Sequence, residues 1–179
     1  SAVNLPLSAA TPTADAAAAK VIADALAAEL APRSFSLTTG VDAVAGGKGD
    51  DSIVGVIANV TTANSTGTTF QAGDVINGGT GTDTLTVSIA GGAAGSNAAV
   101  TLTGVEKVLA NNVNGQTQSI SLALADSSLT TVGHASSNTS AVTTFSGLKK
   151  IVDSELSNGD AGITLTYNST VIAGSADAA

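Results

Sequence analysis

The sequence contains no Cys, Met or Trp and only one His. Without Cys the chain has no disulfide scaffold, no thiolate metal site and no cysteine nucleophile. A single His cannot form the cluster of imidazoles that zinc sites commonly use. Only 6 Lys and Arg stand against 14 Asp and Glu, and a net charge of −8 disfavours binding to nucleic acid. No apolar run reaches the roughly 20 residues of a membrane span, and no signal-peptide pattern opens the chain.

Small residues dominate the 179-residue chain, with 20 Gly and many Ala, Thr, Ser, Asn and Val. Aromatic residues make up 2% of the chain, so few side chains are large enough to fill a thick core. Small side chains pack well where backbones stack closely in thin layers. The composition therefore favours a mainly β protein, a solenoid or a sandwich, over a helical bundle.

The chain divides near residues 32–34. Residues 1–12 read as an extended arm, and residues 13–31 as a helix with an apolar stripe that Pro32 ends. After Arg33 strand patterns take over, and no further helix is expected. We therefore predict an N-terminal part, 1–33, that serves assembly or capping, and a β-solenoid domain, 34–179.

The strongest signal is an internal repeat. GGKGDDSIV (46–54) and GGTGTDTLT (78–86) both fit the nine-residue pattern G-G-x-G-x-D-x-U-x, in which U is a large aliphatic residue. Asp42 and Asp74 each lie nine residues before the Asp of the motif, and the two blocks align at an offset of 32. Two turns of a β-roll are about 18 residues apart. Segment 58–72 is therefore expected to be an inserted loop.

Calcium explains why such a pattern would recur. The ion takes six to eight hard oxygen ligands, and glycine turns can aim backbone carbonyls inward while the Asp adds a carboxylate. Carboxylates crowded in stacked turns repel one another until a divalent cation arrives, so folding would be coupled to calcium. The alternative is that these are ordinary β-turns with no ion.

The second half carries a looser repeat. LTGVEKVLA (102–110) resembles FSGLKKIVD (145–153) at an offset of 43, and the pattern aliphatic-x-x-aliphatic recurs three times. Its pairs are Val105/Val108, Leu129/Val132 and Leu148/Ile151. We expect irregular β-helical rungs over 99–179, with strands at 119–125 and 163–173, after a calcium-binding part at 34–90. A β-sandwich is the alternative fold.

The runs FSLTTGVDAVAGGKGDDSIVG (35–55), GDVINGGTGTDTLTV (73–87) and VTLTGVEKV (100–108) resemble bacterial surface-layer and repeats-in-toxin (RTX) surface proteins. The resemblance implies a calcium-bound β-roll or β-helix, type I secretion and self-assembly outside the cell. By matching position it implies carboxylate ligands at Asp42, Asp50, Asp51, Asp74 and Asp83, and carbonyl ligands at Gly47, Gly49, Gly79 and Gly81. The chain departs from the family in having only two nonapeptides and no obvious C-terminal secretion signal.

Few residues suggest catalysis. We expect His134 to be a surface turn residue, and Asp153 and Glu155 could form a carboxylate pair or, with Asp160, a third calcium site. There is no G-x-S-x-G motif and almost no aromatic platform for sugars.

The favoured hypothesis is therefore a non-enzymatic protein on the bacterial cell surface that binds Ca²⁺ and self-assembles into a layer or filament. A calcium-dependent adhesin or carbohydrate-binding module of a larger exoprotein is the alternative, with cell-surface polysaccharide as its partner. A β-helical enzyme acting on polysaccharides is a third.

Overall fold

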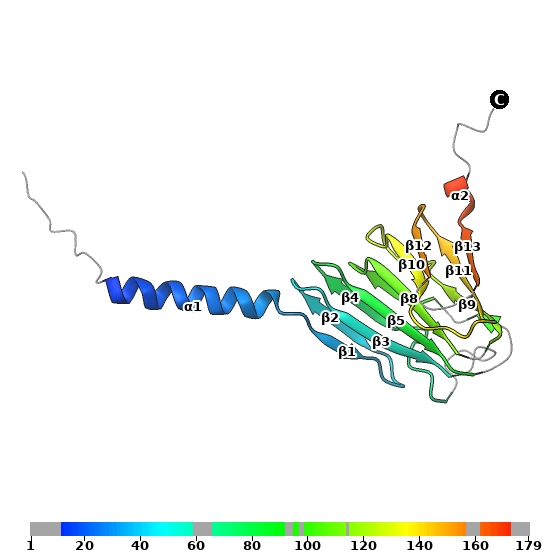
Figure 1. Ribbon diagram of the computed structural model, residues 1–179, viewed down its shortest axis with the longest axis horizontal. Coiled ribbons are helices and arrows are strands. Elements are labelled where there is room, and N and C mark those ends of the chain that lie inside the picture. The colour runs from blue at the N-terminus through cyan, green and yellow to red at the C-terminus, as the bar shows by residue number, and fades with distance from the viewer. Residues whose placement is uncertain are drawn as a thin grey trace, which may run out of the picture.

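A computed structural model describes residues 12–58, 66–91, 95–96, 99–113, 115–156 and 162–172. One long helix, α1 (Pro12–Leu30), leads into parallel β-sheets and projects away from them (Figure 1). Its bounds confirm the predicted helix. Every described side chain over residues 15–30 is exposed, so in the single chain α1 does not cover an end of the β-layers. The arm at 1–11 lies outside the described residues.

Thirteen strands form three sheets within the described chain. Sheet A has six strands in the order β1 (Ser34–Ser36), β3 (Ser52–Ile57), β5 (Thr84–Ile89), β8 (Lys107–Asn112), β10 (Thr131–His134) and β12 (Asp153–Leu156). Sheet B has β2 (Ala43–Gly47), β4 (Val75–Gly79) and β7 (Thr101–Thr103). Sheet C has β13 (Gly162–Tyr167), β11 (Val142–Leu148), β9 (Thr117–Ser121) and β6 (Gly95–Ser96).

Consecutive strands along the chain lie in different sheets, and every described pairing is parallel. The chain alternates between sheets A and B up to β5 and between sheets A and C after β8. An antiparallel β-sandwich does not produce such pairings. The mainly β fold with parallel sheets is thus established.

Inward-facing aliphatic side chains stack along sheet A because successive strands pair in register. Ile53 pairs with Leu85, Leu85 with Val108, and Val108 with Val132, and all four are fully buried. Between them, outward-facing small residues alternate along each strand, the period expected of a sheet with one covered face. Few large side chains are needed because each layer is only one strand spacing thick, about 4.8 Å.

The register confirms the first repeat and corrects the second. Val44 pairs with Ile76, which is the predicted offset of 32, and Ser34 pairs with Ser52, a step of 18. In the second half, Val132 pairs with Ser154, and Ile151 is 78% exposed, so the predicted pair Leu148/Ile151 is wrong.

The resemblance at an offset of 43 reflects a shared turn rather than a shared rung. Leu102 lies in sheet B, whereas Phe145 lies in sheet C. In both segments a glycine with positive φ, Gly104 at 58° or Gly147 at 74°, precedes a buried aliphatic residue. The local sequence similarity therefore indicates a shared turn, but it does not indicate which sheet the neighbouring strand joins.

The described part of the predicted inserted loop, residues 66–72, contains no strand. It nevertheless packs into the core, because Phe70 is fully buried and its backbone N–H donates to the carbonyl of Val56. Residues 59–65 lie outside the described chain. The strand predicted over 163–173 ends at Tyr167, and a one-turn helix, α2 (Ser169–Ile172), follows where the Val171 N–H bonds the Asn168 carbonyl.

Candidate metal centre

A column of acidic side chains marks the corner where the chain enters sheet A. Asp51, Asp83 and Glu106 each directly precede a strand, β3, β5 and β8. Each carboxylate accepts a hydrogen bond from the backbone N–H at the equivalent position of the preceding coil. Arg33 N donates to Asp51 Oδ1 at 2.7 Å, Asp51 N to Asp83 Oδ1 at 2.7 Å, and Asp83 N to Glu106 Oε2 at 2.8 Å.

This column has a structural cause. At a corner the β-ladder is interrupted, and a backbone N–H left without an acceptor would carry a large desolvation penalty. A carboxylate oxygen is a strong acceptor for such a group. The result places acidic groups in successive layers, about 4.8 Å apart, where they repel one another.

Asp83 is the acid in this column that has a buried carboxylate oxygen without a hydrogen-bond donor in the described chain. Its side chain is 0% exposed, and Oδ2 has no hydrogen-bond partner among the described residues. Burial raises the pKa of the Asp83 carboxyl, and the nearby carboxylates of Glu106, Asp51 and Asp50 raise it further. The hydrogen bond from Asp51 N lowers the pKa, but the net shift is upward. A buried anionic oxygen without a donor is the chemistry that a bound cation would satisfy.

The two glycine-rich turns stack directly on each other beside this column. Thr80 N donates to the Gly47 carbonyl at 3.0 Å, and a Cβ on Gly79 would overlap that same oxygen. Gly79 also has φ of 104°, and Gly81 has φ of 125°. The close approach and the positive φ together explain why only glycine fits at Gly79.

Asp42 and Asp74 occupy a different corner, before β2 and β4 of sheet B. Both oxygens of Asp74 accept backbone N–H groups, from Asp42 at 3.0 Å and Gln71 at 2.9 Å. Asp42 accepts the N–H and the hydroxyl of Thr38. Four of the five predicted aspartate ligands therefore form two separate pairs, Asp42 with Asp74 and Asp51 with Asp83, at opposite ends of β2 and β4.

The remaining predicted ligands surround the first turn. Asp50 is exposed, and its Oδ1 accepts Thr82 N at 2.7 Å from the next turn. Gly49 packs against the carbonyl of Leu30 at the end of α1, and Lys48 pairs with Glu29 of the helix. Arg33 Nη1 donates to the Gly46 carbonyl at 3.1 Å. The positive group beside this carbonyl of the first turn is therefore the guanidinium of Arg33.

A cation fits the second turn better than the first. Asp51 Oδ1 and Oδ2 both accept backbone N–H groups, whereas Asp83 keeps one oxygen free. No group of three or more His, Asp or Glu side chains in the described ranges is close enough together to hold a metal ion. An ion here would therefore combine the carboxylate of Asp83 with backbone carbonyls.

Sequence reasoning missed Glu106. It occupies the aspartate position of the third coil, because Thr84 pairs with Lys107 and each follows its acid directly. The signal was available as an acidic residue immediately before an alternating run, here EKVLANN. The longer side chain and the absence of two of the three pattern glycines, with only Gly104 present, hid it from the nonapeptide pattern.

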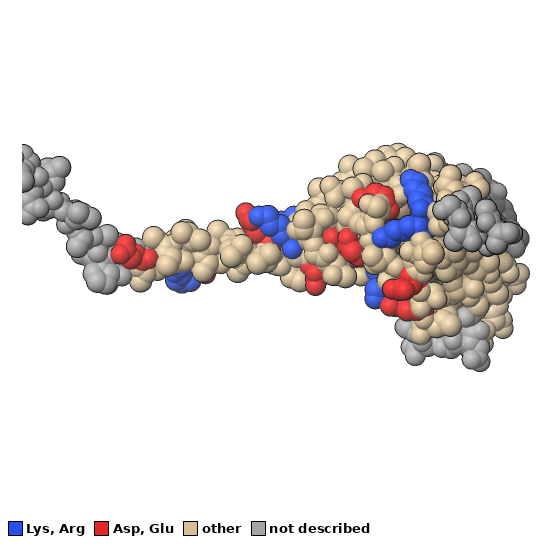
Figure 2. All heavy atoms as spheres, turned by 90° about the horizontal axis from the view of Figure 1, so that it is seen from above, with Lys and Arg blue, Asp and Glu red and all other residues tan. Residues whose placement is uncertain are grey.

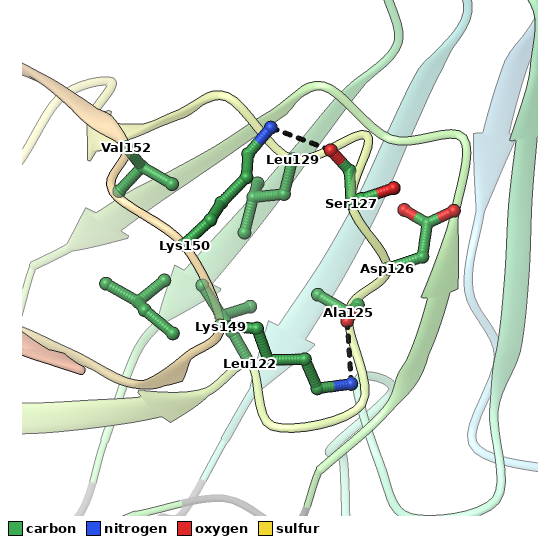
Figure 3. Close-up of a pocket in the computed structure, with 9 residues that line it drawn as sticks. Leu122, Ala125, Asp126, Ser127, Leu129, Lys149, Lys150 and Val152 are labelled. Atoms are coloured by element: carbon green, nitrogen blue, oxygen red, sulfur yellow. Dashed lines mark hydrogen bonds between the residues drawn. The ribbon is translucent and has the colours of Figure 1, made fainter. Parts of the chain in front are cut away.

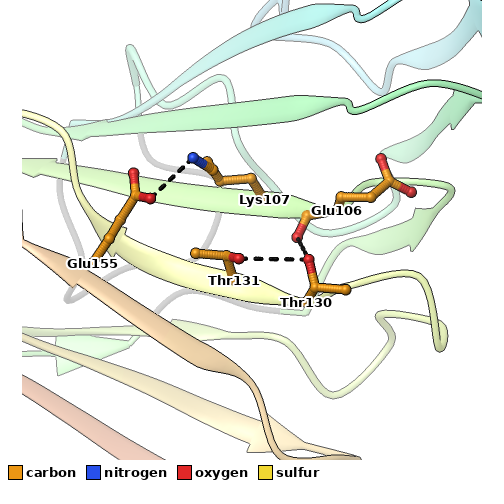
Figure 4. A network of polar contacts seen from close by, with 5 residues as sticks. All are labelled: Glu106, Lys107, Thr130, Thr131 and Glu155. Atoms are coloured by element: carbon orange, nitrogen blue, oxygen red, sulfur yellow. Dashed lines mark hydrogen bonds and ion pairs between the residues drawn. The ribbon is translucent and has the colours of Figure 1, made fainter.

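Other predicted candidates lie away from this corner. His134 is 1% exposed on β10, so its placement on a surface turn is wrong; it points inward because it lies two residues after buried Val132. Glu155 reaches across β10 to Lys107, at 2.9 Å (Figure 4). Asp153 is exposed, and Asp160 lies outside the described residues.

A comparison of the chain with models of protein families, with curated proteins and with solved structures finds no match. Within the described residues, no helix combines the length and the apolar character needed to cross a membrane.

Proposed function

We propose that the chain is a secreted structural protein of the bacterial cell surface that binds calcium and assembles with copies of itself. In this proposal the three parallel sheets are the walls of one β-solenoid, whose coils pass in turn through sheets A, B and C. The proposal extends the resemblance to surface-layer and RTX proteins, including export by type I secretion. The buried, unpartnered Oδ2 of Asp83 is the observation that carries it.

Calcium would act as the fastener between coils. Asp83 would supply its free carboxylate oxygen, and the carbonyls of Gly79 and Gly81 would supply further oxygen ligands. The nearby charges of Asp50 and Glu106 would add to the negative potential of this corner. The bound ion would neutralise a column of charges that otherwise repel. The acidic groups at the second corner, Asp42 and Asp74, would keep the structural role that their hydrogen bonds indicate.

Self-assembly is supported by unpaired edges and by a weakly charged surface. β1 and β12 are the edge strands of sheet A, and edge strands recruit further strands unless they are protected. Figure 2 shows the charged side chains along α1 and on the adjoining face of the β-layers, while much of the rest of that view is uncharged. Association of such surfaces is opposed less strongly when bound divalent cations reduce the net charge of −8.

Titration with a chelator tests both parts of the proposal. Circular dichroism would report folding and light scattering would report assembly, as calcium is removed with EGTA and then restored. We expect both signals to fall and then recover, whereas magnesium at the same concentration should not restore them. Folding and assembly that ignore EGTA would contradict the proposal, and binding to a glycan array by monomers that never assemble would favour the adhesin.

A further inference from the structure

A cavity of about 290 Å³ lies between two corners that join sheet C to sheet A, residues 122–129 and 148–152 (Figure 3). Its apolar lining consists of Leu122, Ala125, Leu129, Leu148 and Val152, each at most 8% exposed. Its polar lining is confined to Asp126, Ser127, Lys149 and Lys150. An apolar interior with a few polar groups at the edge is the usual construction of a small-molecule site.

The cavity exists because the coil becomes shorter. Sheet B ends at β7, and only an isolated bridge between Leu102 and Ala125 extends it by one coil. From β9 to β10 the chain passes through residues 122–130, but from β11 to β12 it passes through residues 149–152 alone. Of the short connection, Lys149, Lys150 and Val152 line the cavity, and these side chains do not fill the space against the apolar surface of residues 122–129.

Two lysines span the opening of this cavity. Lys149 Nζ donates to the Ala125 carbonyl at 3.0 Å, and Lys150 Nζ donates to the Ser127 carbonyl at 2.7 Å. In Figure 3 the two side chains reach toward separate points of the opposite corner. An ammonium group has three donors, so each lysine retains two for another acceptor.

These lysines differ from the other lysines of the chain. Lys20, Lys48 and Lys107 each form a salt bridge with a carboxylate. Neither cavity lysine has a described carboxylate within 4.0 Å, even though the chain carries more than two acidic residues for each basic one.

Asp126 also lines the cavity. Burial raises the pKa of its carboxyl, but hydrogen bonds from Ser128 and from Gly104 N, together with the charge of Lys150, lower that pKa overall. The cavity edge therefore carries two lysines without a direct ion pair and one carboxylate, which leaves an excess of positive charge beside buried apolar surface.

We propose that this cavity binds an amphiphilic anion, a medium-length alkyl chain ending in a carboxylate or a phosphate. The alkyl chain would fill the space between Leu129, Leu148 and Val152, and the head group would accept hydrogen bonds from Lys149 and Lys150. An apolar cavity of about 150 Å³ holds a benzene molecule, so this one suits an alkyl chain of about eight to ten carbons. The inference does not rest on calcium binding or on assembly.

Calorimetric titration of the full chain with decanoate and with decyl phosphate, at low micromolar concentration, tests the site. Both ligands should bind, and the double substitution Lys149→Gln with Lys150→Gln should weaken both by about tenfold or more, because charge-assisted hydrogen bonds are lost. Decanol should bind wild type and this variant equally and more weakly than decanoate binds wild type. Lys20→Gln, an exposed lysine far along α1, is the matched control and should change nothing.

A second variant separates the alkyl site from the charges. Ala125→Leu should fill part of the cavity and weaken decanoate and decanol alike, and circular dichroism checks that it is folded. The proposal is wrong if wild type binds neither decanoate nor decyl phosphate, or if the double Gln variant binds the anions as well as wild type does. It is also wrong if decanol binds wild type as tightly as the anion that binds best. Binding of one head group but not the other assigns the anion as carboxylate or phosphate and upholds the site.

Discussion

Replacement of Asp83 by Asn should raise stability without calcium and lower it with calcium. In wild type the ionised carboxylate is buried beside Glu106 and Asp51, and its Oδ2 has no donor. Asn keeps an oxygen that can accept the Asp51 N–H and removes the charge. An unsatisfied buried group costs about 1–3 kcal/mol, so the variant should gain about 1 kcal/mol in EGTA, or about 2–4 °C in Tm.

With calcium the order should reverse. A ligand that binds only the folded state stabilises it by about 2.7 kcal/mol at a hundredfold excess over its Kd. Asp83→Asn removes the anionic ligand and should lose most of that gain. Differential scanning calorimetry of both proteins, in EGTA and in calcium, measures the two differences directly.

The pH dependence provides an internal check. The pKa of Asp83 is raised in the folded state above its ordinary value of 3.8, so the folded protein holds that proton more tightly than the unfolded chain does. The stabilising contribution is complete below about pH 3.8 and is lost as pH rises through the folded-state pKa. The advantage of Asp83→Asn in EGTA should therefore vanish in acid and grow toward neutral pH.

Asp74→Asn is the matched control, since Asp74 is also buried in a coil corner. Both of its oxygens accept backbone N–H groups, so the amide of Asn would face a donor with another donor. This variant should lose about 1–3 kcal/mol whether or not calcium is present. If Asp83→Asn also destabilises the protein in EGTA, or if calcium stabilises it as much as wild type, Asp83 does not play the role assigned to it.

Two further predictions follow from the backbone and from His134. Gly79→Ala should lower the free energy of unfolding, measured by chemical denaturation, by more than about 2 kcal/mol, because a Cβ at this positive φ would overlap the Gly47 carbonyl. Gly40→Ala is the control and should be nearly neutral, because a Cβ has room there. Equal effects of the two substitutions would refute the reasoning. Burial lowers the pKa of His134 below its ordinary 6.5, so its contribution to stability should be complete above about pH 6.5 and should fall below it as the unfolded chain takes up the proton first. His134→Gln should flatten thermal stability between about pH 5 and 7, and an unchanged slope would count against burial as the cause.

The first half of the fold was predictable because its repeat uses residue types with few substitutes, glycine in the turns and an acidic residue at the corner. Positive φ and close stacking demand glycine at Gly79, and an unpaired N–H at a coil corner demands an acceptor such as the carboxylate of Asp83. These demands recur in each coil, so the same letters recur at the pairing distance. The sequence therefore predicts both the turns and the register between Val44 and Ile76.

In the second half of the chain, the sequence pattern specifies the register between coils less strongly than in the first half. Any aliphatic residue satisfies an inward position, and coils there differ in length, so an alignment of aliphatic residues cannot distinguish neighbouring registers. This is why the predicted pair Leu148/Ile151 is wrong: Ile151 is 78% exposed, and Val152 takes the buried position. The same freedom concealed Glu106 and the cavity, since both depend on which coils are adjacent in space rather than on a local motif.

Backbone N–H and carbonyl groups at successive coil corners are hydrogen-bonded by different kinds of side chain. In the first coil the guanidinium of Arg33 donates to the Gly46 carbonyl. In the next coils carboxylates accept backbone N–H groups. In the coil after Glu106, the hydroxyl of Thr130 donates to the Glu106 carbonyl. Beyond that point Lys149 and Lys150 donate to carbonyls. The acidic corners accumulate negative charge, whereas the lysine corner carries its own cations. The two proposals therefore make separate demands on the stack: the proposed calcium dependence is expected of the coils around Asp83, and the proposed anion binding of the coils around Lys149.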